Sequence, residues 1–338
     1  MSTLPALDTF DAWLPLIFMG LLGTSLLIYA LLDGFDLGVG MLLPRATTAQ
    51  RDQMIASIGP FWDGNGTWLV LGMGLVVVAF PKAQGLIMQQ LYLPALALLI
   101  GLVLRGVSFD FRIKAPAAQQ PMWNGLLFAG SMLASLAQGW MLGRYITGFA
   151  EGSAYTAFAA LTAITIPATY VLLGACWLVM KTEGELQQDA ITWAKIAWPA
   201  AVVAVALISI ATPWVSPVVR ERWFSLPATL ALLPVPLVAA GLLLGLRASL
   251  NSSRTRGKLC WLPFGQLVGV FVLCAFGLGY SLFPDIVIGR MSAWQGAASP
   301  DALKVLLFGV SITLPVILIY TAYVYRVFWG KVRDLRYG

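Results

Sequence analysis

Residues 31–44 read LLDGFDLGVGMLLP, and residues 59–68 read GPFWDGNGTW. Together the two segments place Asp33, Asp36 and Asp63 inside or at the edge of long apolar runs. A charged side chain at the centre of a bilayer costs about 2.5–3.5 kcal/mol on insertion scales, so such residues face a partner, a water cavity or an ion path. The two segments therefore predict a membrane protein in which buried carboxyl groups have a function.

The composition of the whole chain predicts the same class of protein. Of the 338 residues, 59% are hydrophobic and only 11% are charged, whereas a soluble domain carries about 25% charged residues. We predict an all-α integral membrane protein, built as a single polytopic membrane domain over residues 1–338, in which most spans are close to the roughly 20 residues that cross a bilayer. The nine predicted spans are residues 13–43, 58–80, 85–104, 122–143, 157–180, 194–212, 226–246, 261–283 and 305–328.

The start of the second span fixes the depth of Asp63. The apolar run over residues 67–80 is too short to cross a membrane by itself. The span must therefore begin near Pro60, a residue that suits a first helical turn because its missing N–H is not needed there. This start places Trp62, Asp63 and Asn65 in the cytoplasmic third of the membrane.

The basic residues predict an N-terminus outside the cytoplasm and a C-terminus inside, because inner loops carry the excess of Lys and Arg. The first twelve residues contain Asp8 and Asp11 but no Lys or Arg, so we expect no secretory signal peptide. The inner segments would hold Arg45, Arg51, Arg105, Arg112, Lys114, Lys181, Lys195, Arg247, Arg254, Arg256, Lys258, Arg326, Lys331, Arg333 and Arg336. The outer segments would hold Lys82, Arg144, Arg220, Arg222, Arg290 and Lys304.

Histidine is absent from the chain. Such a chain cannot supply a His-ligated haem or copper site, so we expect any redox metal to belong to another polypeptide. The three cysteines, Cys176, Cys260 and Cys274, are far apart in the sequence. They are expected to pack between helices rather than to form a disulfide or a zinc site.

The acidic residues suggest proton transfer. Asp33 and Asp36 are three residues apart and share a helix face. A partly desolvated carboxyl group without a full partner can carry a proton near neutral pH, which predicts a proton entry route from the cytoplasm. The residues expected to converge on the inner leaflet are Asp63, Asp33, Asp36 and Asp110 for proton transfer, with Trp62, Asn65, Arg105 and Arg112 in support. For Asp63 the alternative is a structural acid that pairs with an arginine or caps the helix start.

Glycine spacing predicts where helices approach closely. Gly34 and Gly38 form a G-x-x-x-G pattern in the first span, and Gly265 and Gly269 form another in the eighth. Small residues let two helix backbones meet without a side chain between them. We interpret both patterns as packing signals rather than as functional ones.

Three motifs resemble subunit II of the cytochrome bd-type quinol oxidases. They are LLDGFDLGVGMLLP at residues 31–44, IGPFWDGNGTW at residues 58–68 and LRGVSFDFR at residues 104–112. The first two are long and specific, and the nine-span layout extends the resemblance over the whole chain. The amino-acid sequence of the third motif is more similar to that of the cyanide-insensitive branch of the family.

The resemblance implies a subunit of a membrane complex that oxidises quinol and reduces oxygen to water. It implies two four-helix bundles plus one peripheral helix, packed against a haem-bearing subunit I that holds two haems b and one haem d. It also implies that Asp63 lies on a proton path to the haems, with Trp62 and Asn65 beside it. A small single-helix subunit, and a quinone or lipid bound to this chain, are left open, and the expected location is a bacterial cytoplasmic membrane.

Two alternatives come from the residues themselves. A proton-coupled secondary transporter would also use membrane acids, but transporter folds show broken helices near the midplane in two repeats, and transport by the purified chain would favour it. The second alternative is an inert scaffold that only stabilises a haem-bearing partner. Substitution of all four inner aspartates without effect on turnover or proton uptake would favour the scaffold.

Overall fold

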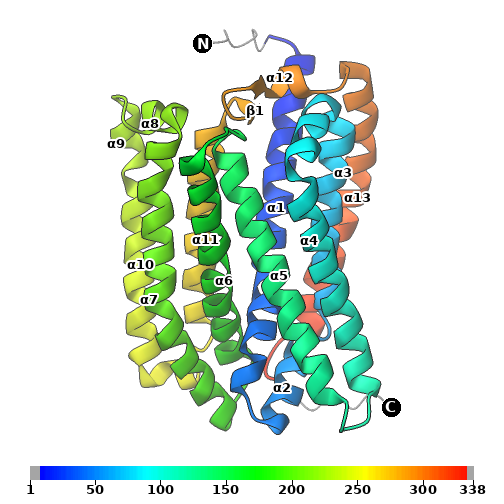
Figure 1. Ribbon diagram of the computed structural model, residues 1–338, viewed down its shortest axis with the longest axis vertical. Coiled ribbons are helices and arrows are strands. Elements are labelled where there is room, and N and C mark those ends of the chain that lie inside the picture. Colours follow the sequence, from blue (N-terminus) through cyan, green and yellow to red (C-terminus); the bar gives the residue numbers. More distant parts are fainter. Residues whose placement is uncertain (1–7, 333–338) are drawn as a thin grey trace.

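The computed structural model describes residues 8–332, which form a bundle of long, roughly parallel and antiparallel helices (Figure 1). Within this range eight helices are long and apolar enough to cross a membrane, and the bent pair α2–α3 makes a ninth span if it is counted as one. The all-α membrane fold with about nine spans is therefore confirmed. The long helices are α1 (Phe10–Leu42), α3 (Trp62–Ala79), α4 (Pro81–Lys114), α5 (Gln120–Ile146), α6 (Ser153–Lys181), α7 (Gly184–Val215), α10 (Pro234–Asn251), α11 (Leu262–Leu282) and α13 (Pro300–Val327). The shorter elements are η1 (Leu43–Arg45), α2 (Thr48–Ile58), α8 (Pro217–Trp223), α9 (Ala228–Leu232), η2 (Ser253–Arg256), β1 (Asp285–Val287), β2 (Met291–Ser292) and α12 (Ala293–Gly296).

The long helices form two groups of four and one outer helix. Helices α1, α3, α4 and α5 pack against one another, as do α6, α7, α10 and α11. Contacts of α6 with α1 and α5 join the two groups, while α13 lies against α1 and α3 at the edge (Figure 1). This arrangement agrees with two four-helix bundles plus a peripheral helix.

The break between α2 and α3 forms one end of the carboxyl-bearing region. The two helices meet at an angle of 47° across a short break that contains Gly59 and Pro60. Proline lacks the N–H that would continue the hydrogen-bond ladder of α2, so the chain bends there and a new helix starts. The bend sets the first turn of α3, which carries Asp63 and Asn65, beside the C-terminal half of α1.

Close contact between α1 and α6 depends on glycine. A methyl group on Gly38 would lie 1.9 Å from the backbone oxygen of Tyr170, and one on Gly174 would lie 2.5 Å from the carbonyl carbon of Gly38. A side chain at either position would push the helices apart, which confirms the packing role of the first G-x-x-x-G. The same approach brings the ring of Tyr170 next to Gly34, one residue from Asp33.

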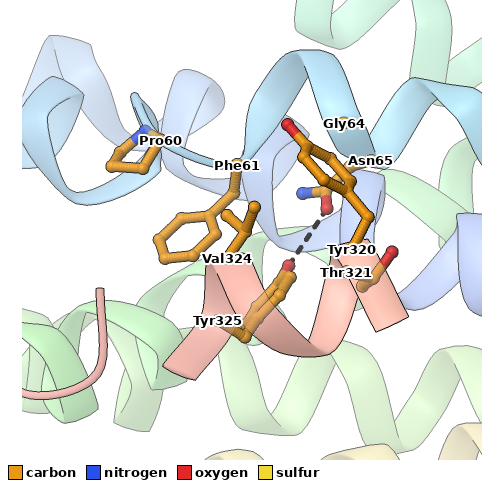
Figure 2. Close-up of a pocket in the computed structure, with 8 residues that line it drawn as sticks. All are labelled: Pro60, Phe61, Gly64, Asn65, Tyr320, Thr321, Val324 and Tyr325. Carbon is orange, nitrogen blue, oxygen red and sulfur yellow. Dashed lines mark hydrogen bonds between the residues drawn. The ribbon is translucent and has the colours of Figure 1, made fainter. Parts of the chain in front are cut away.

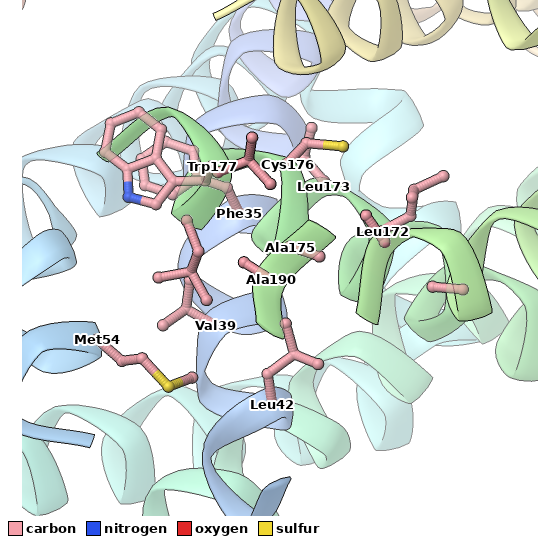
Figure 3. Packing of buried hydrophobic residues seen from close by; sticks show 14 of the residues in the cluster. Phe35, Val39, Leu42, Met54, Leu172, Leu173, Ala175, Cys176, Trp177 and Ala190 are labelled. Atoms are coloured by element: carbon pink, nitrogen blue, oxygen red, sulfur yellow. The ribbon is translucent and has the colours of Figure 1, made fainter. Parts of the chain in front are cut away.

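Buried aromatic rings fill the core between the two groups of helices. Phe35 of α1 stacks on Trp177 of α6 with ring centroids 3.9 Å apart, and Phe61 contacts the edge of Trp177 at 5.5 Å. Aliphatic side chains of α1, α2, α6 and α7 surround these rings (Figure 3). The C-terminal half of α1 is thus enclosed by protein, so its polar side chains must find their partners within the bundle.

A small cap covers the opposite end of α1. The hairpin of β1 and β2 leads into α12, and both lie over the start of α1 (Figure 1). The indole N–H of Trp294 donates a hydrogen bond to the backbone oxygen of Ala12 at 2.8 Å. This bond fixes the beginning of α1 relative to the segment that leads into α13.

Candidate functional site

Two carboxyl groups lie in the interior of the bundle on α1. The exposed fractions of Asp33 and Asp36 are 0% and 1%. Asp33 forms an ion pair with Arg105 of α4, which is also buried. Burial of an ion pair removes the hydration of both charges, so the pair depends on its close contact for stability. We refer to Asp33, Asp36 and Arg105 as the carboxyl cluster.

Asn65 of α3 connects Asp36 to the peripheral helix. The Asn65 side-chain amide donates hydrogen bonds to Oδ2 of Asp36 at 2.8 Å and to the backbone oxygen of Leu32 at 3.2 Å. The Tyr325 hydroxyl of α13 in turn donates to Oδ1 of Asn65 at 3.0 Å, the bond drawn in Figure 2. Because one end of an amide accepts and the other donates, the Tyr325 bond determines which end of Asn65 faces Asp36.

A small cavity lies beside this amide, between the start of α3 and the C-terminal part of α13 (Figure 2). Its volume is about 10 Å³, which is close to the space that one water molecule needs. The hydroxyl of Tyr325 and the amide of Asn65 supply polar partners for such a water. The cavity is lined by Pro60, Phe61, Gly64, Asn65, Tyr320, Thr321, Val324 and Tyr325.

The carboxyl cluster contains fewer positive than negative groups. Within residues 8–332, Arg105 is the basic residue that pairs with Asp33, and Asp36 has no Lys or Arg nitrogen within 4.0 Å. Three polar atoms of the cluster have no hydrogen-bond partner in this part of the chain: Oδ2 of Asp33, Oδ1 of Asp36 and Nε of Arg105. An isolated buried carboxylate is costly and is neutralised by a proton when no cation pairs with it. With one guanidinium for two carboxyl groups, the cluster is neutral when it holds one exchangeable proton.

Three further polar side chains lie near Asp33. The Tyr170 hydroxyl of α6 donates to Oε1 of Gln138 at 2.7 Å, and Nε2 of Gln138 in α5 donates to the Tyr29 hydroxyl of α1 at 3.0 Å. Tyr29 and Tyr170 are both buried. The hydroxyl of Tyr29 interacts electrostatically with the carboxyl group of Asp33, one helical turn away.

Arg112 lies beyond Arg105, near the C-terminal end of α4, and has its own partners. Its guanidinium donates to Asn124 of α5 at 2.7 Å and pairs with Asp52 of α2 at 2.6 Å. The Asp52 side chain is 59% exposed while that of Arg112 is 5% exposed. Arg112 thus joins three helices at the end of the bundle and does not join the carboxyl cluster.

Of the remaining predicted residues, the two aspartates face outward. Asp63 and Asp110 are exposed on the surface of the chain, whereas Trp62 is partly buried and its ring lies 5.1 Å from that of Phe109. Of the four carboxyl groups that were expected to converge, the structure brings together those of Asp33 and Asp36. Arg105 and Asn65 lie beside them, as expected. The exposure of Asp63 follows from its place on α3, because residues 63 and 65 lie on different sides of a helix.

Sequence reasoning missed the tyrosines and the glutamine. Gln138 carried a usable signal, since it is an amide inside the apolar run of α5. Tyr29, Tyr170 and Tyr325 carried none, because a tyrosine in a membrane helix is most simply explained as an interfacial or packing residue. Only the packing of α1, α3, α5, α6 and α13 shows that these side chains meet the aspartates.

The part of the chain that the structure describes shows no cluster of the side chains that most often bind a metal ion. The sequence has no histidine. Between residues 8 and 332, His, Cys, Asp and Glu form no group of three or more that could hold a metal ion. The three cysteines are not paired with one another.

Comparison with known proteins supports the interpretation of the motifs. A family model described as cytochrome bd terminal oxidase subunit II matches residues 14–328. The chain is 27% identical to cytochrome bd-I ubiquinol oxidase subunit 2 of Escherichia coli K12, with 92% of this chain and 93% of the relative covered. It is 26% identical to cytochrome bd ubiquinol oxidase subunit 2 of Bacillus subtilis 168, with 94% and 95% covered.

A solved structure has the same fold. A chain of the bd oxidase from Geobacillus thermodenitrificans superposes with a TM-score of 0.76 at 15% sequence identity, over 94% of this chain and 98% of that chain. The similarity covers both groups of four helices, so the arrangement that encloses the carboxyl cluster is shared at the level of the fold.

Proposed function

Because the chain belongs to the family of cytochrome bd terminal oxidase subunit II, we propose that it supplies the proton-uptake path of a quinol:oxygen oxidoreductase. It is a multi-span subunit of a bacterial respiratory oxidase, and haem belongs to the complex. The reduction of oxygen to water consumes protons that must reach the haem site through protein. A path through this chain would account for carboxyl groups held inside its helices.

The observation that carries the proposal is the charge balance of the carboxyl cluster. Asp33 pairs with Arg105, whereas Asp36 is bonded only by the neutral amide of Asn65. Asp36 is therefore the group of the cluster that takes up and releases a proton. The neighbouring cavity, with room for one water molecule, supports access of protons to this position.

Asp63 would act at the surface of the chain. It is exposed on a membrane-spanning helix, and a carboxylate that faces lipid is costly. We therefore expect the haem-bearing subunit to cover Asp63, so that this carboxyl group lies on the proton path at the boundary between the two chains. Asp110, also exposed, would lie near the cytoplasmic entrance.

The redox groups would lie in the partner. Since this chain has no histidine, we assign the two haems b and the haem d to subunit I, where they carry out quinol oxidation and oxygen reduction. The N-terminus would lie outside the cytoplasm and the C-terminus inside, as the basic residues indicate. A small single-helix subunit and a bound quinone or lipid would be additions to this pair.

The test is a pair of substitutions in the intact complex. Asp36→Asn and Asp63→Asn each remove one proton-carrying group while they keep the size of the side chain. Loss of a positioned proton-transfer group lowers rates by about 10²–10⁴-fold, so quinol-driven oxygen consumption and proton uptake in proteoliposomes should both fall by about a hundredfold.

Asp301→Asn is the matched control, because that carboxylate is 98% exposed at the start of α13. The control is expected to keep normal turnover and normal proton uptake. If both Asp36→Asn and Asp63→Asn behaved like the control, this chain would be a structural scaffold and the proposal would be wrong.

A further inference from the structure

Hydrogen-bond donors in the core of the bundle form a directed chain. The first donor is the hydroxyl of Tyr170, which bonds to the oxygen of Gln138 at 2.7 Å. The second is the nitrogen of Gln138, which bonds to the hydroxyl oxygen of Tyr29 at 3.0 Å. The three side chains come from α6, α5 and α1, so this series of hydrogen bonds crosses the contact between the two groups of helices.

The hydroxyl of Tyr29 still has its own proton to donate. Its oxygen accepts from Gln138, so its proton must point elsewhere. Asp33 lies four residues further along the same helix face, and its Oδ2 has no hydrogen-bond partner within residues 8–332. The Tyr29 hydroxyl, whose proton has no acceptor, therefore lies near Oδ2 of Asp33, which has no donor.

The side-chain amide of Gln138 sets the direction of this series of hydrogen bonds. Its oxygen can only accept and its nitrogen can only donate. With the oxygen bound by Tyr170, the nitrogen must face Tyr29, and the Tyr29 proton must then turn toward Asp33. We propose that Tyr29, Gln138 and Tyr170 are positioning residues that hold a hydroxyl proton against Oδ2 of Asp33 and thereby keep the exchangeable proton of the carboxyl cluster on Asp36.

Asp36 is held in a related way, which explains the division between the two acids. Tyr325 donates to Asn65, and Asn65 donates to one oxygen of Asp36. Asp33 is paired with the guanidinium of Arg105, whereas the hydrogen bond to Asp36 comes from the neutral amide of Asn65. The groups that face Asp33 are Tyr29 and Asp36 of α1, Arg105 of α4, Tyr170 of α6 and Tyr325 of α13. The donors are therefore arranged unevenly around the two acids, with Arg105 and, in our proposal, the Tyr29 hydroxyl directed at Asp33.

This inference rests on the proposed proton-uptake function and is tested in the same intact complex. Tyr29→Phe removes one hydroxyl and leaves the ring in place. We expect kcat and the rate of proton uptake to fall about tenfold, as for a lost hydrogen bond to a charged group, while haem content and the quinol KM stay unchanged. Gln138→Leu should give the same loss, and the double variant should be no worse than Tyr29→Phe, because Gln138 acts through Tyr29.

Infrared spectroscopy supplies a readout that a packing defect would not change. In the native complex the C=O band of the protonated carboxyl group should disappear with Asp36→Asn and persist with Asp33→Asn. In the Tyr29→Phe background part of this band should also depend on Asp33, because Asp33 now shares the proton. A band that depends on Asp36 alone in both backgrounds would overturn the inference.

Tyr145→Phe is the matched control, since Tyr145 is a tyrosine of α5 that donates to the backbone oxygen of Ile286, away from the cluster. It should leave kcat and the infrared band unchanged. If Asp36→Asn stops proton uptake but Tyr29→Phe behaves like Tyr145→Phe, this inference fails and the proposed function stands. If Asp36→Asn and Asp63→Asn have no effect, the proposed function itself fails.

Discussion

At the scale of single residues, Arg105 determines whether α1 can hold two acids inside the bundle. Its guanidinium pairs with Asp33, and both side chains are almost inaccessible to solvent. A buried pair of this kind contributes little net stability over an apolar pair, but removal of one partner leaves an uncompensated charge in the interior. The cluster should therefore be far more sensitive to single substitutions than to a matched double substitution.

We predict that Arg105→Gln destabilises the subunit by about 3–5 kcal/mol, as for a broken buried ion pair. The measurement is the yield and the thermal midpoint of the purified complex. The double variant Asp33→Asn/Arg105→Gln removes both charges and should recover most of the lost stability. Equal losses for the single and the double variant would show that the ion pair is not the cause.

The exposed ion pair of Lys304 with Asp11 is the comparison at the surface. Both side chains are more than 40% exposed, and exposed pairs contribute little to stability because water and salt screen their charges. Lys304→Gln should therefore leave the thermal midpoint nearly unchanged. A loss as large as that of Arg105→Gln would contradict the importance of burial.

At the scale of the helices, α1 is the element around which the site is built. It contacts α3, α5 and α6 along its length, and it supplies Tyr29, Asp33 and Asp36. The glycines at positions 38 and 174 allow α6 to approach α1, and Tyr170, whose backbone oxygen lies at this contact, also donates to Gln138 of α5. Close packing and the directed hydrogen bonds therefore depend on the same backbone contact.

We predict that Gly38→Ala separates α1 from α6, because the added methyl group would lie 1.9 Å from a backbone oxygen that cannot rotate away. Overpacking of this kind costs about 1–3 kcal/mol, so the thermal midpoint of the complex and its turnover should both fall.

Gly20→Ala on the same helix is the control, since an added methyl group meets nothing within 4 Å there. Alanine is a better helix former than glycine by about 1 kcal/mol. The control should thus be neutral or slightly stabilising. A similar fall in thermal midpoint and turnover for both variants would indicate that the close contact with α6 is not the cause.

At the scale of the whole molecule, the ends of α6 and α13 hold each other in place. The Lys181 ammonium group donates to the backbone oxygen of Phe328 at 2.6 Å, and the Lys331 ammonium group donates to that of Thr182 at 2.8 Å. Each lysine thus bonds to carbonyl groups at the end of the other helix, where a positive charge is favourable. The peripheral helix is therefore fastened at the same end of the bundle as the carboxyl cluster.

The two ends of the bundle should lie on opposite sides of the membrane. After replacement of the three native cysteines, Glu151→Cys and Glu183→Cys place single thiols at exposed positions just before and just after α6. With the N-terminus outside, an impermeant maleimide should label residue 151 in intact cells and residue 183 only after the membrane is opened. The reverse pattern would show that the orientation inferred from the basic residues is wrong.

The sequence by itself determined the class of protein, the approximate number of spans and the family. Long apolar runs must be helical in a bilayer because unpaired backbone groups are too costly there. The motifs around Asp33, Asp36, Asn65 and Arg105 were visible because charged and amide side chains are rare in such runs. The G-x-x-x-G of α1 was likewise recognisable as a packing surface, since its spacing places both glycines on one face.

Only the tertiary structure decided which acids meet. Asp63 and Asp110 lie on helices adjacent to the cluster, yet their side chains are exposed, and helix rotation of this kind is set by packing between helices rather than by spacing along one helix. The contacts of Tyr29 with Gln138 and of Tyr325 with Asn65 join residues 109 and 260 positions apart. Apolar helices in a membrane lack a polar face that would specify such neighbours, so the partners of the buried acids follow from the folded bundle alone.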